Sequence, residues 1–135
     1  MASLPPFIAR YEIKQRLGQG GMGAIYLARD PVIDRLVALK LLHNDVASDD
    51  IRKRFAQEAR ASGALTHPNI VTIHDYGEFG DSPFIVMEYV RGETLGELIR
   101  RRAEIPIAQK LRWIEQVCNA LAKGANRICS LDGGW

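Results

Sequence analysis

The chain has 135 residues, enough for one domain with a modest core. Hydrophobic residues make up 47% and charged residues 25%, which is ordinary globular usage and argues against a disordered or fibrous protein. The net charge of +2 comes from 18 basic and 16 acidic side chains scattered along the chain, so we expect no nucleic-acid partner. The cysteines, Cys118 and Cys129, form no C-x-x-C pair, and no apolar run is long enough to span a bilayer. With no signal peptide at the start, we expect a soluble, cytoplasmic protein that avoids membranes.

The first ninety residues carry mostly strand patterns. Residues 1–10 are expected to be a flexible leader, and from Tyr11 apolar and polar residues alternate, which predicts a strand with Tyr11, Ile13 and Leu17 on one face. Similar patterns predict five strands in all, near residues 11–17, 24–29, 36–42, 71–79 and 84–90.

Helical signals interrupt and then follow these strands. Ser48 and the two aspartates after it predict the start of a helix that runs to about Leu65, with apolar residues every four positions. A short helix is expected near residues 93–99 and a longer one from Ile107. The longer helix carries an apolar stripe formed by Ile107, Leu111, Ile114, Cys118 and Leu121. Five strands with a helix inserted after the third, followed by helices, predict an α+β fold.

A glycine-rich segment lies between the first two predicted strands. Gly18, Gln19, Gly20, Gly21, Met22 and Gly23 fit G-x-G-x-x-G. A dinucleotide-binding fold also uses this motif, but there a helix follows it, whereas residues 24–28 read as a strand. A glycine loop between antiparallel strands can bring its backbone N–H groups close to phosphate oxygens. A plain flexible hairpin turn is the alternative reading.

The third strand carries a lysine in an otherwise apolar run. Alternation places Ala38 and Lys40 on the same face, where the small residue leaves room for a flat ring and the lysine can meet phosphates. A lysine buried in a strand needs an anionic partner to stay charged. Glu58, in the middle of the inserted helix, can supply it through an ion pair. Taken alone, Glu58 is better explained as a plain surface glutamate of the helix.

Together these features resemble the eukaryotic-like protein kinases, in the form found in bacterial serine/threonine kinases. Leu17 to Tyr26 looks like their phosphate-covering loop, residues 37–40 like their V-A-I-K strand, and Glu58 like the glutamate of their helix C. His67 to Val71 is similar to the loop after that helix, and residues 84–90 to the fifth strand and hinge. The resemblance covers about residues 10–122.

The resemblance implies an N-terminal kinase lobe at 11–90, then a hinge and the first C-lobe helices, D and E, at 91–122. It implies ATP with Mg as cofactor and Lys40 and Glu58 as the catalytic ion pair. Leu17, Ile25 and Ala38 would enclose the adenine ring, Met87 would be the gatekeeper, and the Glu88 carbonyl and Val90 N–H would bind the adenine edge. The expected nucleotide-binding set is Leu17, Gly18, Gln19, Gly20, Gly21, Met22, Gly23, Ile25, Ala38, Lys40, Met87, Glu88 and Val90.

Residues 123–135 depart from the family pattern, and the chain contains no H-R-D, no metal-binding asparagine after it and no D-F-G. We therefore expect no metal site, and no activity from this chain alone. A reading-frame change, an early stop or a cloning artefact would each explain the departure. Two functions stay open: the ATP-binding lobe of a serine/threonine kinase, or a non-catalytic interaction module. In either case the apolar stripe of residues 107–122 predicts a homo-oligomer.

Overall fold

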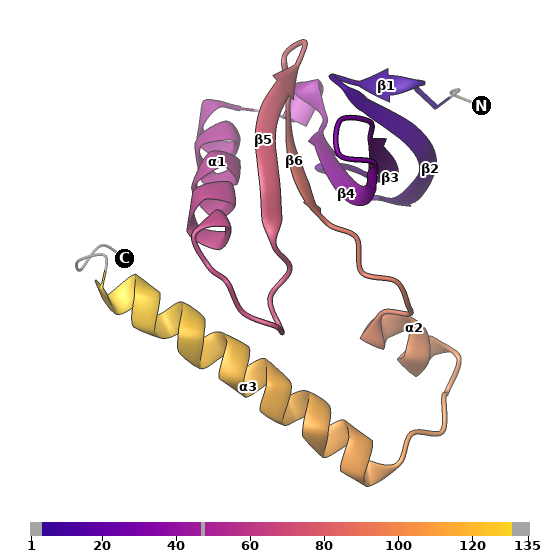
Figure 1. The fold of residues 1–135 in the computed structure, drawn as a ribbon, viewed down its shortest axis with the longest axis vertical. Coiled ribbons are helices and arrows are strands. Elements are labelled where there is room, and N and C mark those ends of the chain that lie inside the picture. The colour runs from indigo at the N-terminus through magenta and orange to yellow at the C-terminus, as the bar shows by residue number, and fades with distance from the viewer. Residues whose placement is uncertain (1–3, 47, 131–135) are drawn as a thin grey trace. The chain divides into compact units, whose positions relative to one another are not determined.

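The computed structural model describes residues 4–46 and 48–130, and they divide into two compact units. The first unit holds residues up to Ala64 and Val71–Tyr89; the second holds Leu65–Ile70 and the chain from Val90 onward. The first unit contains a sheet and one long helix, and the second contains two helices (Figure 1).

The sheet of the first unit is antiparallel and has six strands in the order β1-β2-β3-β4-β6-β5. The strands are β1 (Phe7–Ile8), β2 (Tyr11–Gln19), β3 (Gly23–Asp30), β4 (Arg35–Leu42), β5 (Ile73–Phe79) and β6 (Ser82–Glu88). The five predicted strands are present, and β1 is an addition. The sheet is strongly curled, as the ribbon of β2 shows (Figure 1).

The leader is not loose where the structure describes it. Phe7 and Ile8 pair with the start of β2, and the Ile13 N–H donates to the Pro6 carbonyl at 3.0 Å. Ile8 is fully buried in the core of the sheet. The prediction of a flexible leader is therefore wrong for these residues, because burial of one isoleucine and the pairing with β2 hold them in place.

The two faces of the sheet bury two separate clusters. One cluster joins Ile8 and Tyr11 to alternate residues of the central strands, Ala24, Tyr26, Ala28, Val37, Leu39, Phe84 and Val86. The other lies under the helix and contains Leu42, Phe55, Ala59 and Ile85. Leu17 joins neither cluster, because register shifts at residues 13–15 and 16–18 interrupt the alternation of β2. The predicted alternation from Tyr11 therefore does not continue unbroken to Leu17, which is 41% exposed.

The helix of the first unit, α1 (Asp49–Gly63), follows a short 3-10 turn, η1 (Asn44–Val46). The Ser48 hydroxyl accepts a hydrogen bond from the Ile51 N–H at 3.4 Å, so the predicted N-cap is confirmed. Phe55 and Ala59 are buried and Ile51 is partly buried, which confirms the predicted four-residue apolar spacing.

The second unit contains α2 (Leu95–Arg100) and α3 (Ile107–Ser130). Thr94 and Glu97 form a capping box at the start of α2: the Glu97 N–H donates to the Thr94 hydroxyl at 3.2 Å, and the Thr94 N–H donates to the Glu97 carboxylate at 2.6 Å. The hydrogen bonds that the Thr94 N–H and the Thr94 hydroxyl donate to the Glu97 carboxylate lower the pKa of Glu97. Helix α3 continues eight residues past the predicted segment of 107–122, and residues 131–135 of the expected tail lie outside the described residues. Within the described part of the chain, none of the helices combines the length and apolarity needed to cross a membrane.

Candidate functional site

The glycine-rich segment forms the connection between the antiparallel strands β2 and β3, as predicted. The Gly20 N–H donates to the Gly23 carbonyl at 2.9 Å and closes the turn. A Cβ atom built on Gly18, Gly20 or Gly21 would meet nothing within 4 Å, whereas one on Gly23 would lie 2.2 Å from the Leu41 carbonyl oxygen. Gly23 therefore permits close contact between the loop and β4. The other three glycines leave the loop uncovered, so a ligand can approach its backbone.

One face of the central strands gathers several of the predicted nucleotide contacts. Ala38 lies opposite Met87 of β6 and next to Leu27 of β3, and Lys40 lies opposite Ile25 and Ile85. Directly paired residues of antiparallel strands point to the same side of a sheet. Ile25, Ala38, Lys40 and Met87 therefore share one face, and this face is the one that also packs against α1.

The exposure of these residues differs along the face. Ala38 is 8% exposed and Ile25 is 37% exposed. Leu17, in the irregular part of β2, is 41% exposed. Met87 is partly buried against the cluster under α1. The face thus combines the small, buried Ala38 with the more exposed Ile25 and the partly buried Met87, so a flat ring could lie against it.

Lys40 and Glu58 do not form the expected ion pair in this structure. No salt bridge among the described residues includes Lys40 or Glu58, and Glu58 is exposed on α1. The Lys40 ammonium lies over the ring of Phe55 instead, 5.6 Å from its centroid. The physical reason is the rotation of α1 about its axis: Phe55 and Ala59 face the sheet, and Glu58, one residue before Ala59, lies about 100° around the helix.

The end of β6 is tied to the segment before β5 by two hydrogen bonds. The Glu88 N–H donates to the Thr72 carbonyl at 2.8 Å, and the Thr72 N–H donates to the Glu88 carboxylate at 3.2 Å. Val90 is 62% exposed and belongs to the second unit. The expected adenine contacts of the Glu88 carbonyl and the Val90 N–H stay predictions.

Sequence reasoning missed a polar network on the other face of the sheet. The Tyr11 hydroxyl donates to the Asp75 carboxylate at 2.6 Å, and Arg10 lies 3.2 Å from the same carboxylate and 3.5 Å from Asp30. Burial and the hydrogen bond to Asp75 raise the pKa of Tyr11 far above its ordinary value. Tyr11 and Asp75 are 64 positions apart, so no local spacing could have indicated the pair.

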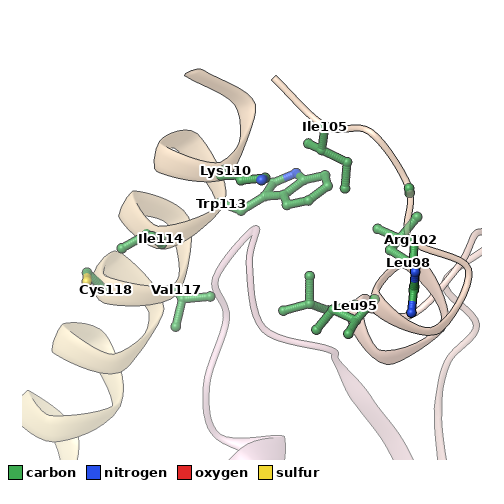
Figure 2. A pocket seen from close by; sticks show the side chains of 11 residues that line it. Leu95, Leu98, Arg102, Ile105, Lys110, Trp113, Ile114, Val117 and Cys118 are labelled. Carbon is green, nitrogen blue, oxygen red and sulfur yellow. The ribbon is translucent and has the colours of Figure 1, made fainter. Parts of the chain in front are cut away.

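The second unit has an apolar groove of about 660 Å³. Figure 2 shows side chains from α2, from the segment after it and from α3 around this groove. Its apolar lining comprises Leu95, Leu98, Ile99, Ala103, Ile105, Trp113, Ile114 and Val117, and Arg102, Lys110 and Cys118 complete it. Ile114 and Cys118 belong to the predicted apolar stripe, so part of that stripe opens into the groove.

The sequence and the fold are both similar to those of known bacterial kinases. The protein kinase domain family matches residues 11–123. The serine/threonine-protein kinase PrkC of Bacillus subtilis is 45% identical over 114 residues, which are 84% of this chain and 18% of that protein. PknB of Mycobacterium leprae is 42% identical over 123 residues, 87% of this chain and 20% of that protein. The chain therefore spans about a fifth of the length of these relatives.

A solved kinase domain agrees with this assignment. The PknI kinase domain of Mycobacterium tuberculosis superposes with a TM-score of 0.78 at 32% identity, covering 93% of this chain and 52% of that one. The expected α+β fold of a kinase N-terminal lobe with helix C is thereby confirmed, with one strand more than predicted. The chain belongs to the protein kinase family and corresponds to part of a bacterial serine/threonine kinase domain.

Proposed function

We propose that this chain supplies the ATP-binding N-terminal lobe of a cytoplasmic serine/threonine protein kinase. The observation that carries the proposal is the arrangement of the uncovered glycine loop beside one sheet face that holds Ile25, Ala38 and Lys40. Loop N–H groups and the Lys40 ammonium would bind the phosphates, and the aliphatic residues would contact the adenine ring. In the parent kinase the transferred group would be the γ-phosphate of Mg-ATP, with protein serine or threonine as acceptor.

We further propose that these 135 residues alone do not transfer phosphate. Kinase catalysis depends on an aspartate that accepts the substrate hydroxyl proton and on an aspartate and an asparagine that hold Mg²⁺. The H-R-D and D-F-G motifs that provide these residues do not occur in the chain. Nucleotide binding should also be weak, since a ligand site normally buries most of the ligand surface and the residues named above supply only one side.

Calorimetric titration with ATP tests the binding proposal. We expect a dissociation constant well above about 1 µM, with little dependence on Mg²⁺, and loss of binding in Lys40→Met. Lys53→Met is the matched control, because Lys53 is exposed on α1. Equal binding of ATP by the Lys40→Met variant and the unmodified chain would refute the proposed site. Sub-micromolar, Mg²⁺-dependent binding of ATP would refute the proposal that the chain supplies only one side of the site.

A second candidate function, a non-catalytic module that self-associates, is favoured by the surface of α3. Ile107, Leu111, Ile114, Val117 and Leu121 are each between 57% and 69% exposed. Full burial of such a side chain is worth roughly 1.5–3 kcal/mol, and contiguous apolar patches of this kind are rarely left exposed on soluble monomers. We propose a homo-oligomer formed through residues 107–122, with a two-fold dimer as its simplest form.

A further inference from the structure

Lys40 has an aromatic partner that the kinase motif set does not contain. Its ammonium lies 5.6 Å from the centroid of the Phe55 ring, within the distance at which a cation is attracted to an aromatic face. Phe55 is 5% exposed, so the ring side of this contact is shielded from water. Among the described residues, this ring is the one charge-stabilising contact recorded for Lys40.

The Phe55 ring is itself held in place. It belongs to the cluster under α1 with Leu42, Ala59 and Ile85, and the Tyr76 ring lies 6.3 Å away at an angle of 53°. A ring fixed by packing on these sides offers a defined position to the ammonium. Lys40, by contrast, is only partly buried, and its strand neighbours Ile25 and Ile85 are apolar.

The contact with the ring leaves the hydrogen-bonding capacity of Lys40 unused. An ammonium has three N–H donors, and an aromatic face attracts its charge without accepting them as a carboxylate would. No hydrogen bond or salt bridge of Lys40 occurs among the residues the structure describes. The donors are therefore free for phosphate oxygens while the ring restrains the side chain.

We propose that Phe55 is a positioning residue of the nucleotide site. Its ring holds the Lys40 ammonium on the α1 face of the sheet while Lys40 is not paired with Glu58. The role in nucleotide affinity rests on the proposed function; the contact itself does not. Phe55 and Glu58 are three residues apart on α1 and thus neighbours on its surface. The ring and the carboxylate are alternative partners of the same ammonium.

The direct test uses nuclear magnetic resonance of the nucleotide-free chain with ¹³C-labelled lysine. Protons above an aromatic face are shifted upfield, so we expect the Lys40 Cε protons upfield of those of Lys53. Phe55→Leu should remove this difference, and Phe79→Leu, which removes an exposed phenylalanine ring, should preserve it. A Lys40 signal without an upfield shift, or one that Phe55→Leu leaves in place, would overturn the proposal.

A second measurement separates the charge of the ring from its packing. Trifluorophenylalanine at position 55 keeps the shape of the ring but weakens the negative charge on its face, so it applies even where Phe55→Leu fails to fold. We expect the Lys40 signal to move toward that of Lys53 and ADP to bind about two- to five-fold more weakly. Unchanged ADP affinity would show that the ring acts by packing alone and would overturn the positioning role. If ADP binds to no variant, the proposed function fails, while the Lys40 signal still decides the Phe55 contact.

Discussion

The Tyr11 hydroxyl of β2 donates a 2.6 Å hydrogen bond to the Asp75 carboxylate of β5, although three strands separate these two in the sheet. Such a bond is possible only because the sheet curls until its far strands approach each other. The Arg10 guanidinium lies 4.7 Å from the centroid of the Tyr11 ring and 3.2 Å from the Asp75 oxygen that accepts the Tyr11 hydrogen bond. The pair therefore stabilises the curvature that shapes both faces of the sheet.

Tyr11→Phe should lower the free energy of unfolding by about 1.5–3 kcal/mol, because it removes a hydrogen bond to a charged acceptor. Denaturant unfolding of the purified chain measures this change. Tyr76→Phe is the matched control, since its ring is 39% exposed and it should change stability by less than about 0.5 kcal/mol. An equal effect of the two substitutions would show that the Tyr11 hydroxyl contributes nothing specific.

Two alanine substitutions in the glycine loop should separate effects on thermal stability from effects on ATP binding. Gly23→Ala would place a Cβ atom 2.2 Å from the Leu41 carbonyl oxygen, so the loop must shift and stability should fall by about 1–3 kcal/mol. Gly21→Ala meets no atom within 4 Å and should leave the melting temperature unchanged while weakening ATP binding. Thermal unfolding and calorimetry together test this. A stable Gly23→Ala chain would contradict the close approach of the loop to β4.

Stability should depend on pH through His74. Partial burial lowers the pKa of His74 and the nearby Arg35 lowers it further, while Glu88 opposes them. The unfolded chain therefore binds a proton at His74 more readily than the folded chain does. The contribution of neutral His74 to the free energy of unfolding is fully present above the ordinary pKa of 6.5 and is lost as the pH falls below that value. His74→Gln should therefore show a smaller loss of unfolding free energy between pH 7.5 and 5.5 than the unmodified chain. Identical pH slopes of the two chains would contradict the lowered pKa.

Charged substitutions on the exposed stripe of α3 should dissociate the proposed oligomer. Leu111→Glu with Ile114→Lys places charges on two apolar positions that are each 58% exposed. Light scattering at tens of micromolar should then report a monomer, and circular dichroism should show that the sheet is retained. Gln116→Glu, at an exposed position on the opposite face of α3, should leave the oligomer intact. A monomeric mass for the unmodified chain would exclude self-association at this concentration.

The chain should show no kinase activity. With radiolabelled ATP, Mg²⁺ or Mn²⁺ and a basic protein substrate, labelling should not exceed that of a Lys40→Ala control, because the groups that hold the metal ions are missing from these residues. Labelling that disappears in Lys40→Ala would disprove this prediction and would require a different set of metal-binding and proton-accepting residues.

Most of the secondary structure could be predicted from the sequence because it depends on local patterns. Alternation in β4 placed Ala38 and Lys40 on one face, and Ser48 with the apolar spacing after it marked the start and the buried side of α1. The glycine loop lies in a hairpin because the residues on both of its sides favour strands. These features need only neighbours a few positions apart.

Tertiary structure decided the partners of the charged and polar groups. Lys40 lies over Phe55 rather than beside Glu58 because the rotation of α1 is set by packing Phe55 and Ala59 against the sheet. Tyr11 reaches Asp75 only through the curl of the sheet, and Ile8 becomes part of the core only when β1 pairs with β2. Each of these contacts joins segments that are far apart in the sequence, and local periodicity gives no information about which segments meet. The sequence alone therefore identified the chemical groups but not the pairs that they form.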